Sequence, residues 1–145
     1  TQFTYFQQMA GIECKPVSAE LTYGLERICM FTQGKKNVFD LVWNNFGMKY
    51  RDIFYQAEKE YSAYNFEYAN IENLLKNFEI AESECKSLLK KKLPLPAYDQ
   101  CLKASHVFNL LDARGAIGVA QRTEFISRIR DLAKESGEIW LESQK

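Results

Sequence analysis

The sequence predicts a mainly α fold, in which a short antiparallel strand pair and one helix are followed only by helices. Residues 1–8 alternate between two faces as a strand does, and a turn-like segment at 9–11 joins them to a second extended stretch. From residue 50 onward, apolar residues recur at intervals of three and four, as on amphipathic helices. The 145 residues are 46% hydrophobic and 14% aromatic, which is enough for a core and excludes a disordered chain.

The charge balance and the cysteines narrow the classes of function. Lys and Arg together number 19, as do Asp and Glu, and this argues against a free-standing nucleic-acid binder, which is usually basic. The apolar runs are only a few residues long, so we expect no membrane span. The four cysteines form no C-x-x-C pair and there is one histidine, so neither a structural metal site nor a disulfide framework is expected. Reduced, buried cysteines are the simpler expectation.

The first 34 residues are expected to run strand, turn, strand, helix. The strand at 1–8 mixes polar and apolar side chains on both faces, and the second strand, at 12–17, should end near its proline. Ser18 is a good N-cap, so a helix should follow to about Gln33, where Gly34 ends it. Two strands are not stable alone, so the pair is expected to belong to a larger sheet, most of which lies upstream.

The rest of the chain is expected to be helical. The apolar stripe of the longest helix repeats every three or four residues, and the "LPLP" at 93–96 should stop that helix, because proline is excluded from helix interiors. The chain is therefore divided into residues 1–36 and a helical domain at 37–145. The expected helices cover about 50–68, 70–92, 97–113 and 119–143.

The stretch "ELTYGLERI", residues 20–28, places the dipeptide Glu26–Arg27 in the middle of the first expected helix. By helical periodicity alone, this pair would be an ordinary solvated charge pair. However, the order of features resembles motif 3 of the class II aminoacyl-tRNA synthetases. A polar strand is followed by a strand-to-helix junction and then by Gly-x-Glu-Arg. A guanidinium is planar and permanently charged, so it can lie over adenine and reach the phosphates of ATP. Glu20 departs from the motif, which has a small residue there.

Three longer stretches resemble the α subunit of the heterotetrameric bacterial glycyl-tRNA synthetase. The resemblance covers nearly the whole chain and corresponds to the C-terminal half of that subunit, whose upstream half would hold motifs 1 and 2. The resemblance implies that residues 1–36 form the C-terminal end of a class II catalytic core. The stretches are "TQFTYFQQMAGIECKPVSAELTYGLERI" at 1–28, "YNFEYAN" at 64–70 and "LPLPAYDQCLKASHVFNLLDARGAI" at 93–117.

The resemblance implies ATP-dependent activation of glycine to glycyl-adenylate and its transfer to tRNA(Gly). ATP with Mg²⁺ on its phosphates would be the substrate, and no structural metal is implied. The expected partners are a β subunit, a second α subunit, tRNA(Gly) and glycine, in a cytoplasmic α2β2 assembly without a membrane. Because motif 2 is absent, this chain alone is expected to be inactive. The alternative is a non-catalytic helical module that binds partner chains.

The resemblance also assigns residues. Arg27 is the candidate catalytic and ATP-binding residue, and Glu26 is the carboxylate that would support it. Gln7 is a candidate ATP ligand, because the corresponding strand floors class II active sites. Thr4, on the opposite face of that strand, is assigned to packing.

A glycine pocket needs an anion for the ammonium group and close walls. Glu13 on the second strand and Glu20 at the start of the helix are rival candidates for that anion, and the sequence leaves the choice open. A carboxylate such as Glu20 in a first helical turn is also simply favourable for the helix. Ser18 is both the expected cap and a candidate wall of the pocket.

Overall fold

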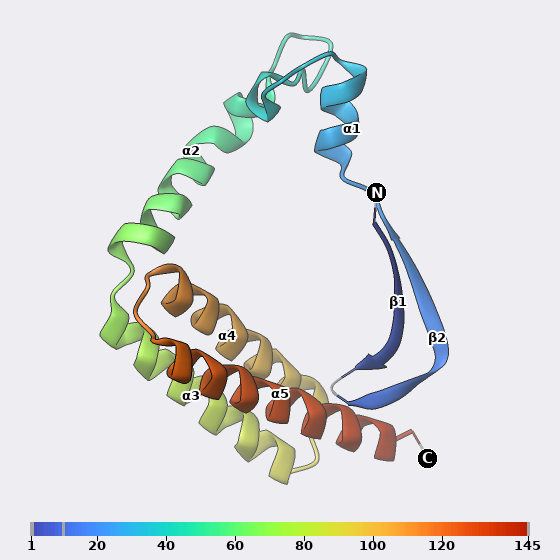
Figure 1. Cartoon of the computed structure of the whole chain (residues 1–145), viewed down its shortest axis with the longest axis vertical. Helices are drawn as coiled ribbons and strands as arrows, with labels where there is room; N and C mark the ends of the chain where they lie inside the picture. The colour runs from blue at the N-terminus through green and yellow to red at the C-terminus, as the bar shows by residue number, and fades with distance from the viewer. Residues whose placement is uncertain (1, 10, 145) are drawn as a thin grey trace.

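The computed structural model describes residues 2–9 and 11–144, and its elements follow the predicted order. The hairpin of β1 and β2 and helix α1 form one side of an open frame, α2 forms a second side, and α3, α4 and α5 lie together along the third (Figure 1). In the described part no strand follows residue 60, so the mainly α fold with a leading strand pair is confirmed. The elements are β1 Gln2–Met9, β2 Ile12–Thr22, α1 Leu25–Thr32, the 3-10 turn η1 Val38–Asp40, α2 Tyr50–Ala63, the π-helical turn η2 Tyr64–Tyr68, α3 Ile71–Lys90, α4 Pro94–Ala113 and α5 Val119–Glu142.

The core lies between α3, α4 and α5, which form a three-helix bundle. The predicted stripe of α3 supplies much of it, because its apolar residues face the other two helices at helical spacing. The rings of Phe78 and Phe125 meet edge to face with centroids 4.6 Å apart. The most completely buried large side chains of the bundle are Phe78, Cys85, Leu89, Leu111 and Leu132.

One carboxylate is buried in the bundle and is fully partnered. Glu82 accepts hydrogen bonds from Arg128 at 3.0 Å (Nε) and 2.5 Å (Nη2), and Lys86 Nζ lies 3.0 Å from its Oε1. The Arg128 guanidinium also stacks over Phe78, 4.6 Å from the ring centroid. The hydrogen bond from Arg128 lowers the pKa of Glu82 to about 2, against burial, which alone would raise it.

The hairpin is long, irregular and open to solvent. β1 and β2 pair in regular antiparallel register from Gln2↔Thr22 to Phe6↔Ser18, and again at Gln8↔Glu13. Between the two stretches Gln7 alone faces residues 14–17, so β2 bulges and bends there. The tip of the hairpin rests on α5. A Cβ at Gly137 would lie only 3.3 Å from Ile12 Cδ1.

The prediction that a helix begins at Ser18 is wrong. Ser18 is not an N-cap but continues β2, which runs past the proline to Thr22, and α1 begins at Leu25 after Gly24. The reason is tertiary: the backbone groups of residues 2–6 need partners, and residues 18–22 supply them. Glu20 therefore lies on a strand instead of in a first helical turn.

The later helices match their predicted ranges to within two residues except at two boundaries. The helix expected at 50–68 is α-helical only to Ala63 and continues as the π-helical turn η2. "LPLP" does end α3, but α4 begins at Pro94 and not at 97. Proline is tolerated there because the first residue of a helix has no intrahelical partner for its backbone N–H. In the described ranges, no helix combines the length and the apolarity that crossing a bilayer requires.

Candidate functional site

The second strand brings three of the candidate residues to one face of the hairpin. Each of the three has a partner across the ladder on β1, which is Gln8 for Glu13, Phe6 for Ser18 and Thr4 for Glu20. Because Thr4, Phe6 and Gln8 are every second residue of β1, they point to the same side, as do their partners. We call this side the Glu20 face. It consists of Gln2, Thr4, Phe6 and Gln8 of β1 and Glu13, Ser18, Glu20 and Thr22 of β2.

Two threonines on the Glu20 face make side-chain contacts that sequence reasoning did not anticipate. Thr22 Oγ1 donates a hydrogen bond to Glu20 Oε1, and Gln2 Nε2 donates to Thr4 Oγ1 at 3.2 Å. Thr4 stands directly across the ladder from Glu20, and its assignment to packing stays a prediction. The cross-strand register would have identified both threonines if residues 18–22 had been assigned to β2.

The opposite face of the hairpin is apolar in its regular part. Phe3 pairs with Leu21 and Tyr5 with Ala19, and the rings of Phe3 and Tyr5 meet edge to face with centroids 4.9 Å apart. By the alternation of β1, Gln7 belongs to this face, at the bulge. The structure therefore does not bring Gln7 together with the candidate carboxylates.

Arg27 is the third residue of α1 and not a mid-helix residue. A Cβ at Gly24, the N-cap, would lie 3.5 Å from Arg27 Cδ, so the stem of Arg27 passes beside Gly24. This agrees with the tilt of helical side chains toward the N-terminus, and it directs Arg27 back toward the end of β2. The side chain is exposed. The free N–H groups of the first helical turn add further positive potential there, and the combination suits a phosphate group.

Glu26 precedes Arg27 on α1, where neighbouring side chains point about 100° apart and do not face each other. Among residues 2–9 and 11–144, no ion pair joins Glu26 to Arg27. The supporting role assigned to Glu26 stays a prediction.

The two glutamates differ in their surroundings. Glu13 lies near the tip of the hairpin, with Lys15 Nζ 3.5 Å from its Oε2, whereas Glu20 lies near the end of β2 that leads into α1. Their partners on β1, Gln8 and Thr4, are four residues apart, which is about 13 Å along a strand. Only Glu20 is therefore close, along the strand, to the junction that carries Arg27.

The described residues contain no group of three or more His, Cys, Asp or Glu side chains placed to hold a metal ion. The polar groups on the Glu20 face are carboxylate, hydroxyl and amide groups. They suit a small ammonium-bearing ligand, and Arg27 at the start of α1 suits the phosphates of a nucleotide. Mg²⁺ would accompany such a nucleotide on its phosphate oxygens.

The comparison with known families agrees with this arrangement. The chain matches the family model described as "Glycyl-tRNA synthetase alpha subunit" over residues 1–145. The match includes the hairpin, the junction at Gly24 and Arg27, and the whole helical part. The match covers the entire chain, including a polar strand face that leads directly into a helix with an arginine in its first turn. The chain is therefore a member of the glycyl-tRNA synthetase alpha subunit family.

Proposed function

We propose that this chain supplies part of the site in which glycine is activated with ATP before it is transferred to tRNA(Gly). In that reaction a carboxylate oxygen of glycine attacks the α-phosphorus of ATP. The bond from this phosphorus to the bridging oxygen of pyrophosphate breaks, and glycyl-adenylate and pyrophosphate result. Negative charge builds up on the phosphate oxygens as the bonds exchange, and a fixed positive group lowers the barrier. Mg²⁺ supplies neutralising charge on the phosphates.

The position of Arg27 is the observation that carries the proposal. Its stem passes Gly24 toward the end of β2, where the Glu20 face ends. An adenylate is a small ligand, so the group that binds its phosphate and the group that binds its ammonium must be close together. We therefore assign the phosphate to Arg27 and the ammonium to Glu20, with Ser18 beside it, in preference to Glu13.

The test for Arg27 is the Arg27→Ala variant in the intact synthetase, assayed with its β partner by ATP–pyrophosphate exchange. We expect a loss of about two orders of magnitude or more, which is typical when a contact to a developing charge is removed. Thermal stability should change little because Arg27 is exposed. Arg130→Ala, which removes an exposed arginine from α5, is the matched control. Exchange by Arg27→Ala at a near wild-type rate would refute the assignment.

The choice between the carboxylates is tested by Glu20→Gln and Glu13→Gln. Glutamine keeps an acceptor for Thr22 but removes the charge that the ammonium needs. We expect Glu20→Gln to raise the KM for glycine at least tenfold with little change in the KM for ATP, and Glu13→Gln to change neither. The reverse pattern would assign the binding of the glycine ammonium group to Glu13.

A second role, in assembly, is favoured by the surface of α2 and η2. Neither element has a buried residue, and Tyr61, Phe66 and Tyr68 are each more than half exposed. Exposed aromatic groups of this kind are enriched where protein chains meet. We propose that residues 37–145 contact the other chains of a cytoplasmic α2β2 synthetase. Tyr61→Glu combined with Phe66→Glu should weaken assembly in sedimentation velocity, and an unchanged assembly would contradict this role.

A further inference from the structure

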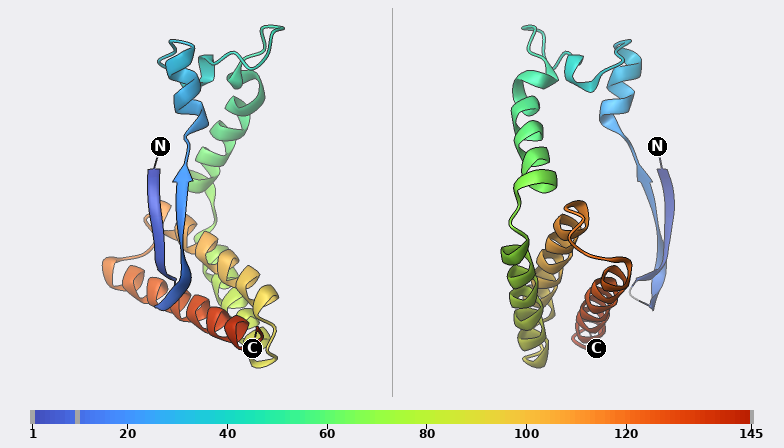
Figure 2. Two further views of the ribbon diagram at one scale, coloured as in Figure 1. Left: turned by 90° about the vertical axis from the view of Figure 1, so that its right-hand side faces the viewer. Right: turned by 60° about the vertical axis from the view of Figure 1, so that its left-hand side comes forward.

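The connection between α1 and α2, residues 34–49, is held by specific polar contacts although η1 is its only helical turn. We call it the elbow. It lies at the corner of the frame that joins α1 to α2 (Figures 1 and 2). A connection of this length inside a folded chain is uncommon unless it has a function.

Gln33 fastens the end of α1 to the elbow. Its Oε1 accepts a hydrogen bond from the backbone N–H of Val42 at 2.8 Å, and its Nε2 donates to the carbonyl oxygen of Val42 at 3.0 Å. One side-chain amide thus satisfies both backbone groups of Val42, as a neighbouring strand would. Val42 also forms a bridge with Lys49, and Tyr50 N–H donates to the Leu41 carbonyl at 2.9 Å. A continuous series of contacts therefore links the last turn of α1 to the first turn of α2.

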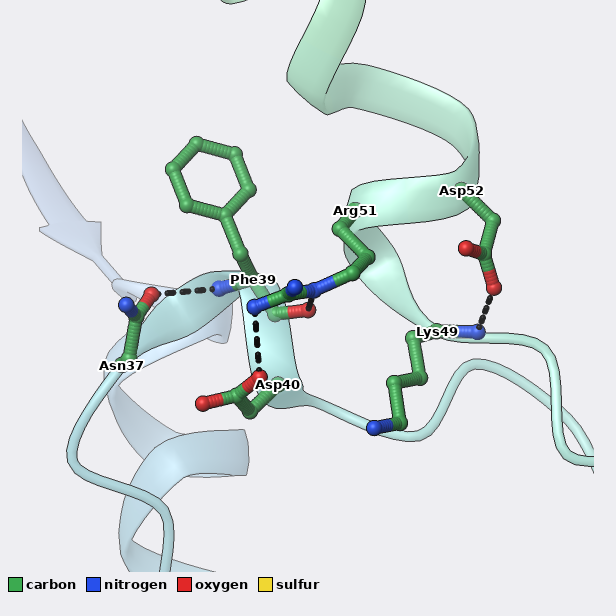
Figure 3. A network of polar contacts seen from close by, with 6 residues as sticks. All are labelled: Asn37, Phe39, Asp40, Lys49, Arg51 and Asp52. Carbon is green, nitrogen blue, oxygen red and sulfur yellow. Dashed lines mark hydrogen bonds and ion pairs between the residues drawn. The ribbon is translucent and has the colours of Figure 1, made fainter.

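Arg51 fastens the elbow from the α2 side (Figure 3). Its Nε donates to the carbonyl oxygen of Phe39 at 3.3 Å, and its Nη2 donates to Asp40 Oδ1 at 2.8 Å. The backbone N–H of Lys49 donates to Asp52 Oδ2 at 2.8 Å and so caps α2. Leu41, the residue that follows Asp40, is 4% exposed.

The direction of α1 depends on its two ends. No residue of α1 is buried by the described residues, so among them the helix is held at its two ends. One end joins β2 at Gly24, and the tip of that hairpin rests on α5 at Gly137. The other end is Gln33, six residues or about 9 Å along the axis from Arg27. A rigid short helix transmits any change in its fastening at Gln33 to the position of Arg27.

We propose that Gln33 and Arg51 are positioning residues for adenylate formation, which hold α1 so that Arg27 meets ATP. This inference rests on the proposed function of Arg27. The Arg51–Asp40 pair is half exposed, with 48% and 43% of the two side chains accessible, and ion pairs of this kind contribute little to folding stability. The consequence of losing it is therefore expected in catalysis and not in folding.

The kinetic test uses Gln33→Ala and Arg51→Ala in the intact synthetase, with ATP–pyrophosphate exchange measured at saturating glycine. Each variant should raise the KM for ATP at least fivefold or lower kcat by that factor, with the thermal midpoint unchanged. Arg51→Lys, which keeps the charge opposite Asp40, should recover part of the loss. Lys76→Ala is the matched control, because Lys76 makes an exposed contact with Glu72 within α3, outside the elbow and outside α2 and η2. Near wild-type kinetics for both alanine variants would overturn the inference.

The double variant Arg27→Ala/Gln33→Ala separates this inference from the proposed function. If Gln33 acts through Arg27, its removal should cost nothing further once Arg27 is gone. An equal loss in both backgrounds would show that the elbow does not act through Arg27 and would overturn the positioning role. The single variant Arg27→Ala, read alone, decides the proposed function.

A readout that does not depend on activity is cleavage by trypsin. Lys35, Lys36 and Lys49 are exposed residues of the elbow. In Gln33→Ala, initial cleavage at these three sites should accelerate at least fivefold, while sites in α3 to α5 keep their rates. Unchanged cleavage of the elbow would show that Gln33 does not hold it, and the inference would fail.

Discussion

Helices α3, α4 and α5 bury the side chains that face one another, whereas β1, β2 and α1 contain no buried side chain among their described residues. The bundle has two apolar clusters and a partnered carboxylate at its centre. The hairpin and α1 are held instead by the strand register, by the contact of Ile12 with Gly137 and by the elbow. Folding stability and the candidate chemistry therefore lie in different parts of this chain.

This division has a consequence for mutagenesis. Substitutions in the bundle should change stability strongly, while substitutions on the Glu20 face or in α1 should change catalysis with little effect on stability. Four measurements test whether folding stability is concentrated in the bundle, and they are taken in order of decreasing effect.

The largest contrast is in thiol reactivity. Burial raises the pKa of Cys85 to about 11 and also raises the pKa of Cys101, while Cys29 on α1 is exposed. At pH 8 only about one Cys85 in a thousand is ionised, and the thiolate is the reactive form. Iodoacetamide should therefore modify Cys29 at least about a hundred times faster than Cys85 or Cys101, as followed by mass spectrometry. Comparable rates at native pH would show that the bundle opens readily.

The second contrast compares two phenylalanines. Phe78 is fully buried, and Phe3 on the hairpin is 59% exposed. Phe78→Ala should lower the free energy of unfolding by about 3–5 kcal/mol, because the cavity adds to the lost burial. Phe3→Ala should cost less than about 1 kcal/mol. Urea denaturation of both variants gives the comparison, and equal losses would mean that the hairpin shares the bundle's core.

The third prediction concerns pH. The folded pKa of Glu82, about 2, is below its ordinary value of 4.5, so the charged form is stabilised by folding. This contribution is fully present above about pH 4.5 and is lost as the pH falls toward 2; it is on the order of 3 kcal/mol. Thermal unfolding of the bundle should therefore become easier across that window. Glu82→Gln should lose most of this dependence, and an unchanged acid profile in that variant would assign the effect to other carboxylates.

The smallest effect is expected at the contact between the two regions. Gly137→Ala should gain up to about 1 kcal/mol of helix stability, since alanine is the better helix former. Against this, the new Cβ would lie 3.3 Å from Ile12 Cδ1, whose flexible end must move by a few tenths of an ångström. The same change in an Ile12→Ala background should show the full gain by thermal unfolding. A loss greater than 1 kcal/mol with Ile12 present would show that the hairpin tip is held rigidly on α5.

The fold could be predicted from the sequence where local patterns and packing agree. The stripe of α3 specified a buried face on its own, and the structure buries Leu74, Phe78, Cys85 and Leu89 there. The alternation of residues 1–8, followed by the turn-like sequence at 9–11, likewise indicated a strand pair. The candidate role of Arg27 was inferred from its motif, which is local in sequence, and it stays a prediction.

Residues close together along the chain were enough to indicate the helices of the bundle, the existence of the hairpin and the family to which the chain belongs. The secondary structure of residues 18–22 depends on tertiary contacts. Their serine cap and apolar spacing favoured a helix, but their backbone pairs with β1. That pairing placed Thr4 and Thr22 beside Glu20 and set Gln7 apart. The elbow was also beyond sequence reasoning, because Gln33 contacts Val42 and Arg51 contacts Phe39 and Asp40 only after the chain has turned back on itself. Local patterns indicate the secondary structure that one segment prefers. The hydrogen-bond partner of a backbone or amide group depends on which distant segment folding brings within hydrogen-bonding distance.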